Sequence, residues 1–114
     1  MSECLFCRIA KGELPVPFLH EDEEVVAFAD IHPQAPVHVL LIPRRHVATV
    51  AEIGTEDETL MDRLTRAANR IAREKGIDRS GYRLVVNCNA EGGQTVFHLH
   101  MHLLGGRSMQ WPPG

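Results

Sequence analysis

The chain has 114 residues, and its 12 Lys and Arg against 15 Asp and Glu give a formal net charge of −3. With 44% hydrophobic residues, this composition excludes a disordered chain, and the acidic balance excludes nucleic acid as an expected main partner. Apolar runs such as residues 39–42 are far shorter than the roughly 20 residues of a membrane span. The N-terminus lacks the pattern of a secretory signal, so we expect a cytoplasmic protein.

Helix and strand signals follow one another without a repeat or a linker, which predicts one domain over residues 1–114. Ser2 can cap a short helix that Gly12 ends. A longer amphipathic helix begins at Thr55, which is expected to form a capping box with Glu58, and Gly76 ends it. The sum is an α+β domain with a mostly antiparallel sheet. The expected elements are a helix over residues 3–11, strands over 16–20, 25–29 and 37–42, a helix over 55–75, and strands over 82–87 and 97–103.

Three of the seven histidines, His98, His100 and His102, alternate with apolar residues. Successive side chains of a strand point to opposite faces, so the three imidazoles should lie in a row on one face. Histidines can act as nucleophiles, proton donors and metal ligands near neutral pH. The row spans about 13 Å, which is too wide for one ion with bonds of about 2.1 Å. This width argues against a metalloenzyme in which all three bind one catalytic ion.

The loop before the histidine row contains a Gly-Gly pair, Gly92 and Gly93. Glycines let backbone N–H groups approach an anion closely, and Asn87, Gln94 and Thr95 add neutral donors. The composition is typical of a phosphate cradle, although a flexible hairpin loop uses the same glycines.

Cys4 and Cys7 stand three residues apart on one face of the first helix. This Cys-x-x-Cys spacing supplies half of a tetrahedral zinc site. Packed thiols without a metal are the alternative, and a thioredoxin-like redox role is disfavoured because no predicted strand precedes the pair. Three cysteines in a chain of this kind do not predict a disulfide framework.

The histidine row resembles a known family motif. Residues 98–104 match the His-φ-His-φ-His-φ-φ pattern, with φ hydrophobic, of the histidine-triad (HIT) superfamily. Residues 30–38, 81–87 and 105–114 are similar to the Hint branch of that superfamily. The resemblance implies a HIT-like fold, a homodimer, a purine nucleoside monophosphate site in each subunit, and hydrolysis of nucleoside 5′-phosphoramidates to a nucleotide and an amine.

The same resemblance assigns roles by position. His100 would attack the α-phosphorus and form a nucleotidyl-histidine intermediate, which water then hydrolyses. His102 would contact the α-phosphate and the leaving group, and His38 matches a further histidine near the site. The phosphate oxygens would be held by Asn87, Gly93 and Thr95, with Gln94 in the same loop.

Asp30 would accept hydrogen bonds from the ribose hydroxyls, although a turn-forming role explains it as well. Trp111 is expected at a subunit interface, contributing to the partner subunit. Core packing is an equal explanation for the residues expected to enclose the base. These are Phe6, Ile9, Leu14, Phe28 and Ile31.

Zinc-holding bacterial relatives complete the cysteine pair with two histidines, which here are His46 and His98. The resemblance therefore implies a structural, non-catalytic zinc bound by Cys4, Cys7, His46 and His98, and no organic cofactor. The remaining His20, His32 and Cys88 are expected to be structural or to lie on the surface.

Two other functions remain open at this point. One is a dinucleoside polyphosphate hydrolase or nucleotidyl transferase of the same superfamily. The C-terminal residues 111–114 argue against it, because they resemble the Hint branch. The other is a nucleotide-binding scaffold protein whose activity is incidental. The sequence defines neither the amine leaving group nor the preference between adenine and guanine.

Overall fold

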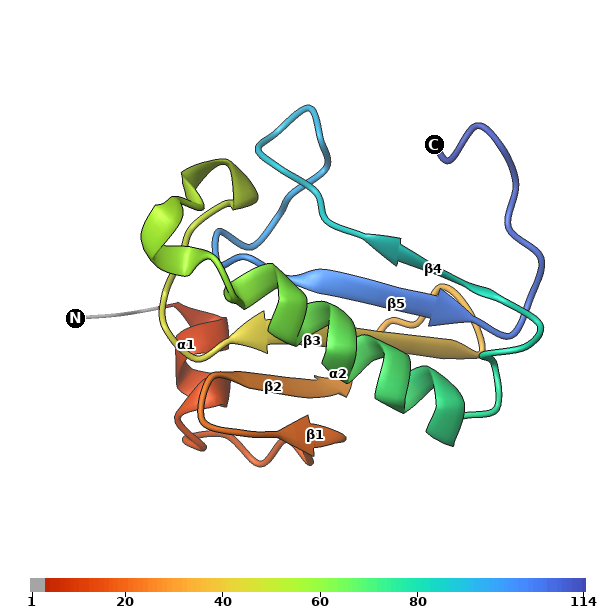
Figure 1. Ribbon diagram of the computed structural model, residues 1–114, viewed down its shortest axis with the longest axis horizontal. Coiled ribbons are helices and arrows are strands. Elements are labelled where there is room, and N and C mark those ends of the chain that lie inside the picture. The colour runs from red at the N-terminus through yellow and green to blue at the C-terminus, as the bar shows by residue number, and fades with distance from the viewer. Residues whose placement is uncertain (1–3) are drawn as a thin grey trace.

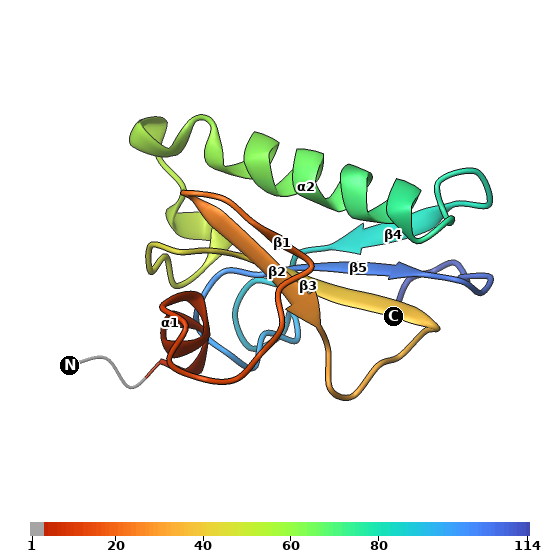
Figure 2. The same cartoon turned by 90° about the horizontal axis from the view of Figure 1, so that it is seen from below.

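A five-stranded antiparallel sheet carries one helix on each face in the computed structural model, which describes residues 4–114 (Figures 1 and 2). The strand order is β1-β2-β3-β5-β4. The predicted α+β class, the antiparallel sheet and the two helices are confirmed within these residues. The elements are α1 Leu5–Ala10, β1 His20–Glu21, β2 Val25–Ala29, β3 Val37–Pro43, 3₁₀ turns at Val50–Glu52 and Thr55–Asp57, α2 Leu60–Glu74, β4 Tyr82–Val85 and β5 Met101–Gly105.

The central strands β2 and β3 are covered on both faces, which explains their almost uninterrupted apolar sequences. Leu41 packs into the core between the sheet and α2, whereas Ile42 packs into the core beneath α1, and both are fully buried. Figure 2 shows α2 on one side of the sheet and α1 on the other. The sheet therefore separates a large apolar core from a smaller one next to α1.

The apolar stripe correctly predicts helix α2, but the predicted start of the helix is wrong. The helix begins at Leu60 rather than at Thr55, and no capping box joins Thr55 to Glu58. Residues Thr55–Asp57 instead form a 3₁₀ turn in which the Asp57 carboxylate accepts the Gly54 N–H at 3.1 Å and pairs with Arg45. This ion pair holds Asp57 near the end of β3, and the helix begins only at Leu60. The stripe itself is buried as predicted: Leu60, Leu64, Ala67, Ala68, Ile71 and Ala72.

The N-terminal helix is shorter than the predicted span of residues 3–11. It covers Leu5–Ala10, Cys4 is its N-cap, and the Cys4 Sγ accepts the Cys7 N–H at 3.4 Å. The predicted capping residue Ser2 lies outside the described residues. Gly12 follows the helix with a φ of +78°, a conformation that favours glycine, so the predicted end is confirmed.

Three strands are shorter than predicted. The first is reduced to His20–Glu21, because Pro15 and Pro17 offer no N–H for pairing. At the other edge β4 stops at Val85, two residues before the predicted end at residue 87. Strand β5 starts only at Met101 instead of residue 97. Before it, the Leu99 N–H donates to the Val47 oxygen at 2.6 Å, so this segment bonds to a loop rather than to a strand.

The turn between β1 and β2 is organised by Asp22. Its carboxylate accepts the N–H groups of Glu24 and Val25 at 2.7 and 2.9 Å and lies 2.7 Å from the His20 Nε2. Burial acts to raise the pKa of Asp22, but the hydrogen bonds from His20 and the two N–H groups outweigh it and lower the pKa to about 2. The predicted hairpin is confirmed. No helix within residues 4–114 is long and apolar enough to cross a membrane.

We expect an Asp22→Asn variant to be less stable than the wild type at pH 7. A carboxyl whose folded pKa is depressed stabilises the fold above its unfolded pKa, and this contribution disappears as the pH falls toward 2. Urea unfolding at pH 7 and near pH 2 measures the difference. The exposed Asp78→Asn variant is the control. An equal loss of stability at both pH values would contradict the role of the ionised carboxylate.

Candidate active site and metal centre

The three histidines of the row face α1, whereas Leu99, Met101 and Leu103 pack in the core beneath α2. The predicted division between the two faces is therefore confirmed, although the regular strand covers only part of the row. His102 pairs across the sheet with Leu40 on β3 and with Val85 on β4. This register places His102 between β3 and β4, whereas His98 and His100 precede β5.

The protonation of His100 follows from its backbone contact. Its Nδ1 lies 2.8 Å from the carbonyl oxygen of His98, and a carbonyl can only accept, so Nδ1 carries the proton. In the neutral ring Nε2 then has a free lone pair. The buried ring packs edge-on against Phe6, with 5.2 Å between centroids and 89° between planes. His100 thus has a fixed orientation and a nucleophilic nitrogen.

A chain of hydrogen bonds fixes the proton of His102. The Gln34 N–H donates to His38 Nδ1 at 3.0 Å, which leaves the His38 proton on Nε2. That nitrogen lies 2.9 Å from His102 Nδ1 and 3.4 Å from Asp30 Oδ2. His102 Nδ1 therefore accepts, and the neutral His102 ring carries its proton on Nε2.

Both rings are uncharged at neutral pH. Burial lowers the pKa of His102 to about 4, with His100 and His38 acting in the same direction and Asp30 against it. Burial also lowers the pKa of His38, opposed by Asp30. Asp30, His38 and His102 lie close enough together to hold a metal ion. However, the Gln34 N–H keeps the His38 proton on the nitrogen that faces the other two side chains, so this group is a hydrogen-bonded chain.

An apolar cavity of about 420 Å³ opens beside His100 and His102. All six side chains predicted to bind the nucleoside line it, together with the predicted Thr95. His32, which was expected to be structural or to lie on the surface, also lines the cavity. Five further lining residues were not predicted from the sequence: Leu5, Val16, Ala29, Leu40 and Val96. Alternation along β2 and β3 could have indicated Leu40, which shares the face of His102. The predicted residues are Phe6, Ile9, Leu14, Phe28, Asp30 and Ile31.

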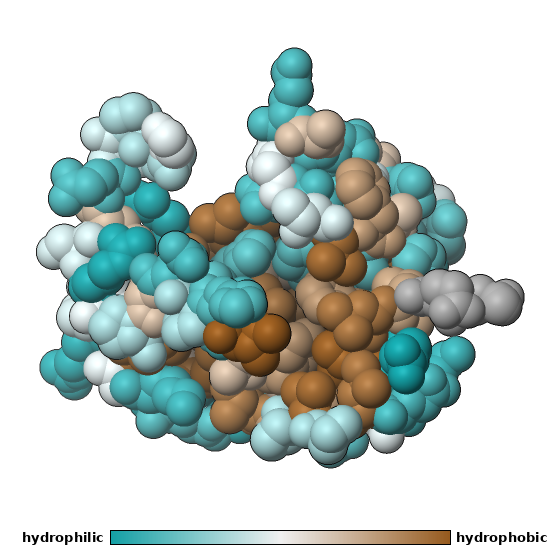
Figure 3. Space-filling model, turned by 180° about the vertical axis from the view of Figure 1, so that it is seen from behind, coloured by the Kyte–Doolittle hydropathy of each residue, from teal (hydrophilic) through white to brown (hydrophobic). Residues whose placement is uncertain are grey.

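Apolar side chains gather on this face of the molecule (Figure 3). Ile31 at the cavity is 85% exposed, so part of its lining is open to solvent. Two other cavities, of about 360 and 520 Å³, are lined mostly by charged side chains. The cavity beside the histidines is the one suited to a flat apolar group with a polar end.

The loop that contains Gly92 and Gly93 is held in place by Gln94. The buried Gln94 side chain accepts the Asn89 N–H at 2.8 Å and donates to the oxygens of Ala48 and Val96 at 2.8 and 3.0 Å. Its amide is thus committed to backbone groups and is not available to bind a phosphate, contrary to the expectation from the sequence. Gly93 has a φ of +90°, and a Cβ there would lie 3.9 Å from the Asn87 Nδ2, so these two predicted phosphate ligands are neighbours.

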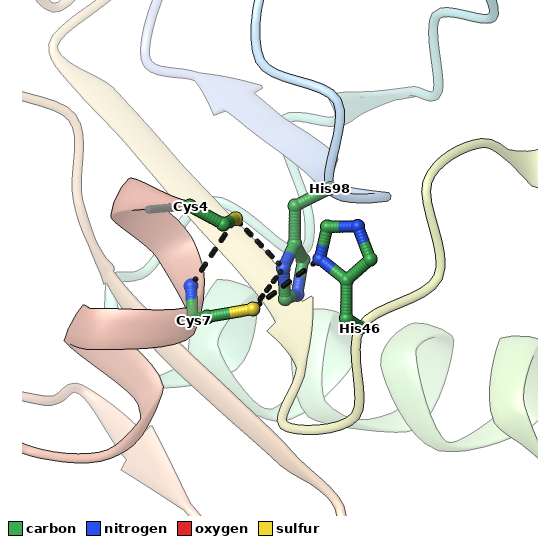
Figure 4. Close-up of side chains that lie close together, drawn as sticks. All are labelled: Cys4, Cys7, His46 and His98. Carbon is green, nitrogen blue, oxygen red and sulfur yellow. Dashed lines mark hydrogen bonds between the residues drawn. The ribbon is translucent and has the colours of Figure 1, made fainter. Parts of the chain in front are cut away.

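Cys4, Cys7, His46 and His98 form a compact cluster in which all four ligand atoms lie within 4.8 Å of one another (Figure 4). His98 Nδ1 is 3.4 Å from Cys4 Sγ and 3.5 Å from Cys7 Sγ, and His46 Nδ1 is 3.2 Å from Cys7 Sγ. Tetrahedral zinc, with bonds of about 2.3 Å to sulfur and about 2.1 Å to nitrogen, separates such atoms by about 3.6 Å.

The protonation of His98 also suits a ligand. Its Nε2 lies 2.8 Å from the Pro43 carbonyl and must donate, so Nδ1 presents its lone pair to the cysteines. Burial lowers the pKa of His98, the Pro43 carbonyl opposes this, and His46 and His100 add to it, which favours the neutral form that binds metals. The donor set therefore fits, and the cluster could hold a metal ion such as zinc.

Three other residues named from the sequence neither line the cavity nor belong to the Cys/His cluster. Trp111 is 83% exposed, and Arg83 donates to the oxygen of the preceding Gln110 at 2.8 Å, which holds the tail to β4. His20 bonds to Asp22 at the β1–β2 turn, as expected for a structural histidine. Cys88 is half-buried in the loop that Gln94 holds.

The family model of the HIT domain matches residues 11–109. The chain belongs to the HIT family. An uncharacterised HIT-like protein of Synechococcus elongatus is 46% identical over all of both chains. The purine nucleoside phosphoramidase of Escherichia coli is 45% identical, over 95% of this chain and 91% of its own.

Solved structures of HIT proteins share the fold. The HIT family hydrolase from Legionella pneumophila has a TM-score of 0.95 at 49% identity, with 98% of this chain and 100% of that chain covered. A histidine triad protein from Clostridium difficile has a TM-score of 0.92 at 39% identity, with 96% of each chain covered. The predicted HIT fold is thereby confirmed for this HIT protein.

We expect ¹H–¹⁵N spectra at pH 7 to show the Nδ1–H tautomer for His100 and the Nε2–H tautomer for His38 and His102. His102 should stay neutral down to about pH 4. Because the unfolded chain binds that proton more readily, the free energy of unfolding should decrease as the pH falls from about 6.5 toward 4. A doubly protonated His102 at pH 6 would contradict the hydrogen-bonded chain.

Proposed function

We propose that this HIT protein is a purine nucleoside phosphoramidase, a hydrolase that cleaves the P–N bond of nucleoside 5′-phosphoramidates such as adenosine 5′-monophosphoramidate. The observation that carries the proposal is the His100 ring, whose Nδ1 proton is held by the His98 carbonyl while the ring lines the apolar cavity. The name of the Escherichia coli relative, at 45% identity, supports the P–N bond as the target.

The cavity supplies the binding of the nucleoside. The purine would lie against the apolar side chains of α1 and β2 that line the cavity, including Phe6 and Phe28. Asp30 accepts the His32 N–H at 2.8 Å and lies 3.4 Å from His38 Nε2, which leaves lone pairs of its carboxylate for the ribose hydroxyls. The phosphate would then lie at the polar end of the cavity, beside Thr95 and His100.

In the first step the lone pair of His100 Nε2 attacks the α-phosphorus, and the bond to the amine nitrogen breaks. The negative phosphate favours the protonated form of His102, which gives its Nε2 proton to the departing nitrogen. Because the protonated ring also carries a proton on Nδ1, the His38 Nε2–H would turn to Asp30 Oδ2, 3.4 Å away, during this step. Asn87, Gly93 and Thr95 would hold the phosphate oxygens as charge develops.

In the second step water attacks the phosphorus of the nucleotidyl-histidine. Neutral His102 now takes a proton from the water, the bond between His100 Nε2 and phosphorus breaks, and the nucleoside monophosphate leaves. His102 returns to the protonated form in which the first step began, so protons balance over the cycle.

The proposed metal is a structural zinc bound by Cys4, Cys7, His46 and His98. A site with four protein ligands leaves no open position for substrate, so the metal holds the fold and takes no part in the steps above. No organic cofactor is needed. We also propose a homodimer in which the exposed Trp111 contributes to the partner subunit.

Replacing His100 by Ala should lower kcat by about 10³-fold or more, because no other side chain can form the covalent intermediate. Steady-state hydrolysis of adenosine 5′-monophosphoramidate measures this, and mass spectrometry of the quenched wild type should find the nucleotidyl adduct on the peptide that contains His100. His20→Gln, outside the cavity, should keep its activity. Normal turnover by the Ala variant would refute the proposal, and AMP binding without any turnover would favour the scaffold function.

Protein purified without chelator should contain about one zinc per chain. Cys4→Ser should lose most of it because one of four ligands is gone, whereas Cys88→Ser should keep it. Elemental analysis of the wild type and the two variants measures the zinc content of each. Equal zinc in Cys4→Ser and wild type would show that this cluster is not the site.

A further inference from the structure

Helix α1 belongs to two sites at once. Its Cys7, with the N-cap Cys4, points to His46 and His98 (Figure 4), whereas Phe6 and Ile9 line the nucleoside cavity. One short helix therefore supplies half of the metal ligands and part of the wall of the cavity.

Apart from the Cys/His cluster, apolar packing and a few polar contacts hold the helix in place. It spans six residues, and isolated helices shorter than about 12 residues are marginal in water. Its ion pair, between Arg8 and Glu13, joins two exposed residues near the helix itself at 3.5 Å. Arg44 donates to the Ala10 oxygen at 2.8 Å, and the apolar side chains pack on β2 and β3. The Cys/His cluster adds the attachment nearest to the start of the helix.

The cluster is also connected to the nucleophile. His98 offers Nδ1 to the cysteines and donates from Nε2 to Pro43, while its main-chain carbonyl accepts the Nδ1 proton of His100. Phe6 packs edge-on against both rings, at 6.0 Å from His98 and 5.2 Å from His100. A displacement of α1 would thus remove a wall of the cavity and the ring that packs on His100.

We propose that Cys4 and Cys7 are positioning residues for the nucleoside site: through the bound metal they clamp α1 against the sheet and hold Phe6 beside His100. This inference rests on the proposed function, because it takes the cavity to be the nucleoside site. Metal loss frees α1 while the sheet and α2 remain folded. Affinity for the nucleotide then falls more than the rate of the chemical step.

The experiment compares the zinc-loaded wild type, the same protein after chelation, and the chelated protein with zinc restored. Calorimetry with AMP should show about a tenfold weaker Kd after chelation, as expected for losing one aromatic contact. Hydrogen exchange should rise over residues 5–10 and stay unchanged over α2. Restored zinc should reverse both changes.

Matched variants separate the clamp from a general structural effect. Cys4→Ser should reproduce the chelated protein, with KM raised about tenfold and kcat changed less. Phe6→Ala should show the same rise in KM while it keeps its zinc. Arg8→Ala, which removes the exposed ion pair of the same helix, should keep both zinc and affinity.

Two results would overturn the clamp. One is a metal-free protein that binds AMP as tightly as the zinc-loaded form and keeps α1 protected. The other is loss of protection over α2 together with α1, because the metal would then hold the whole domain. If the zinc-loaded protein fails to bind AMP, the proposed function is wrong. The comparison of hydrogen exchange in α1 and α2 still tests whether the metal clamps α1.

Discussion

The buried His98 is the residue through which the two candidate sites depend on each other. Its ring is fully buried and engaged at both nitrogens, by the cysteines on one side and by the Pro43 carbonyl on the other. The same residue orients the His100 ring through its main-chain oxygen. A ring placed by several bonds at once has little freedom to turn, which is the preorganisation that a nucleophile requires.

Burial has a second consequence, because it keeps the histidines neutral. Imidazolium rings packed within about 5 Å would repel one another, and removal from water adds to that cost. The neutral rings can instead alternate as donor and acceptor from Gln34 to His102. Asp30 opposes part of this lowering of the pKa, since its carboxylate favours the charged forms of His38 and His102.

The site lies where regular structure ends. Strand β5 begins at Met101, so His98 and His100 belong to a segment that no neighbouring strand pairs with. The Leu99 N–H bonds to Val47 in the loop that also carries His46, and this bond brings the two histidines of the Cys/His cluster together.

Patterns between near neighbours determined what the sequence could reveal. The alternation of residues 98–103 indicated the two faces of the histidine row, the apolar stripe indicated α2, and the spacing of Cys4 and Cys7 indicated half of the candidate metal site. The ends of β5 and α2, the commitment of Gln94 to the loop, and the proton positions of the rings came only from the tertiary structure. Several of these depend on partners far along the chain, as Gln94 does on Ala48, 46 residues away, and His98 on Cys4, 94 residues away. Others, such as the proton on His100 Nδ1, depend on a backbone conformation that only the folded chain fixes. Local periodicity reports which face a side chain occupies, but folding alone decides what it meets there.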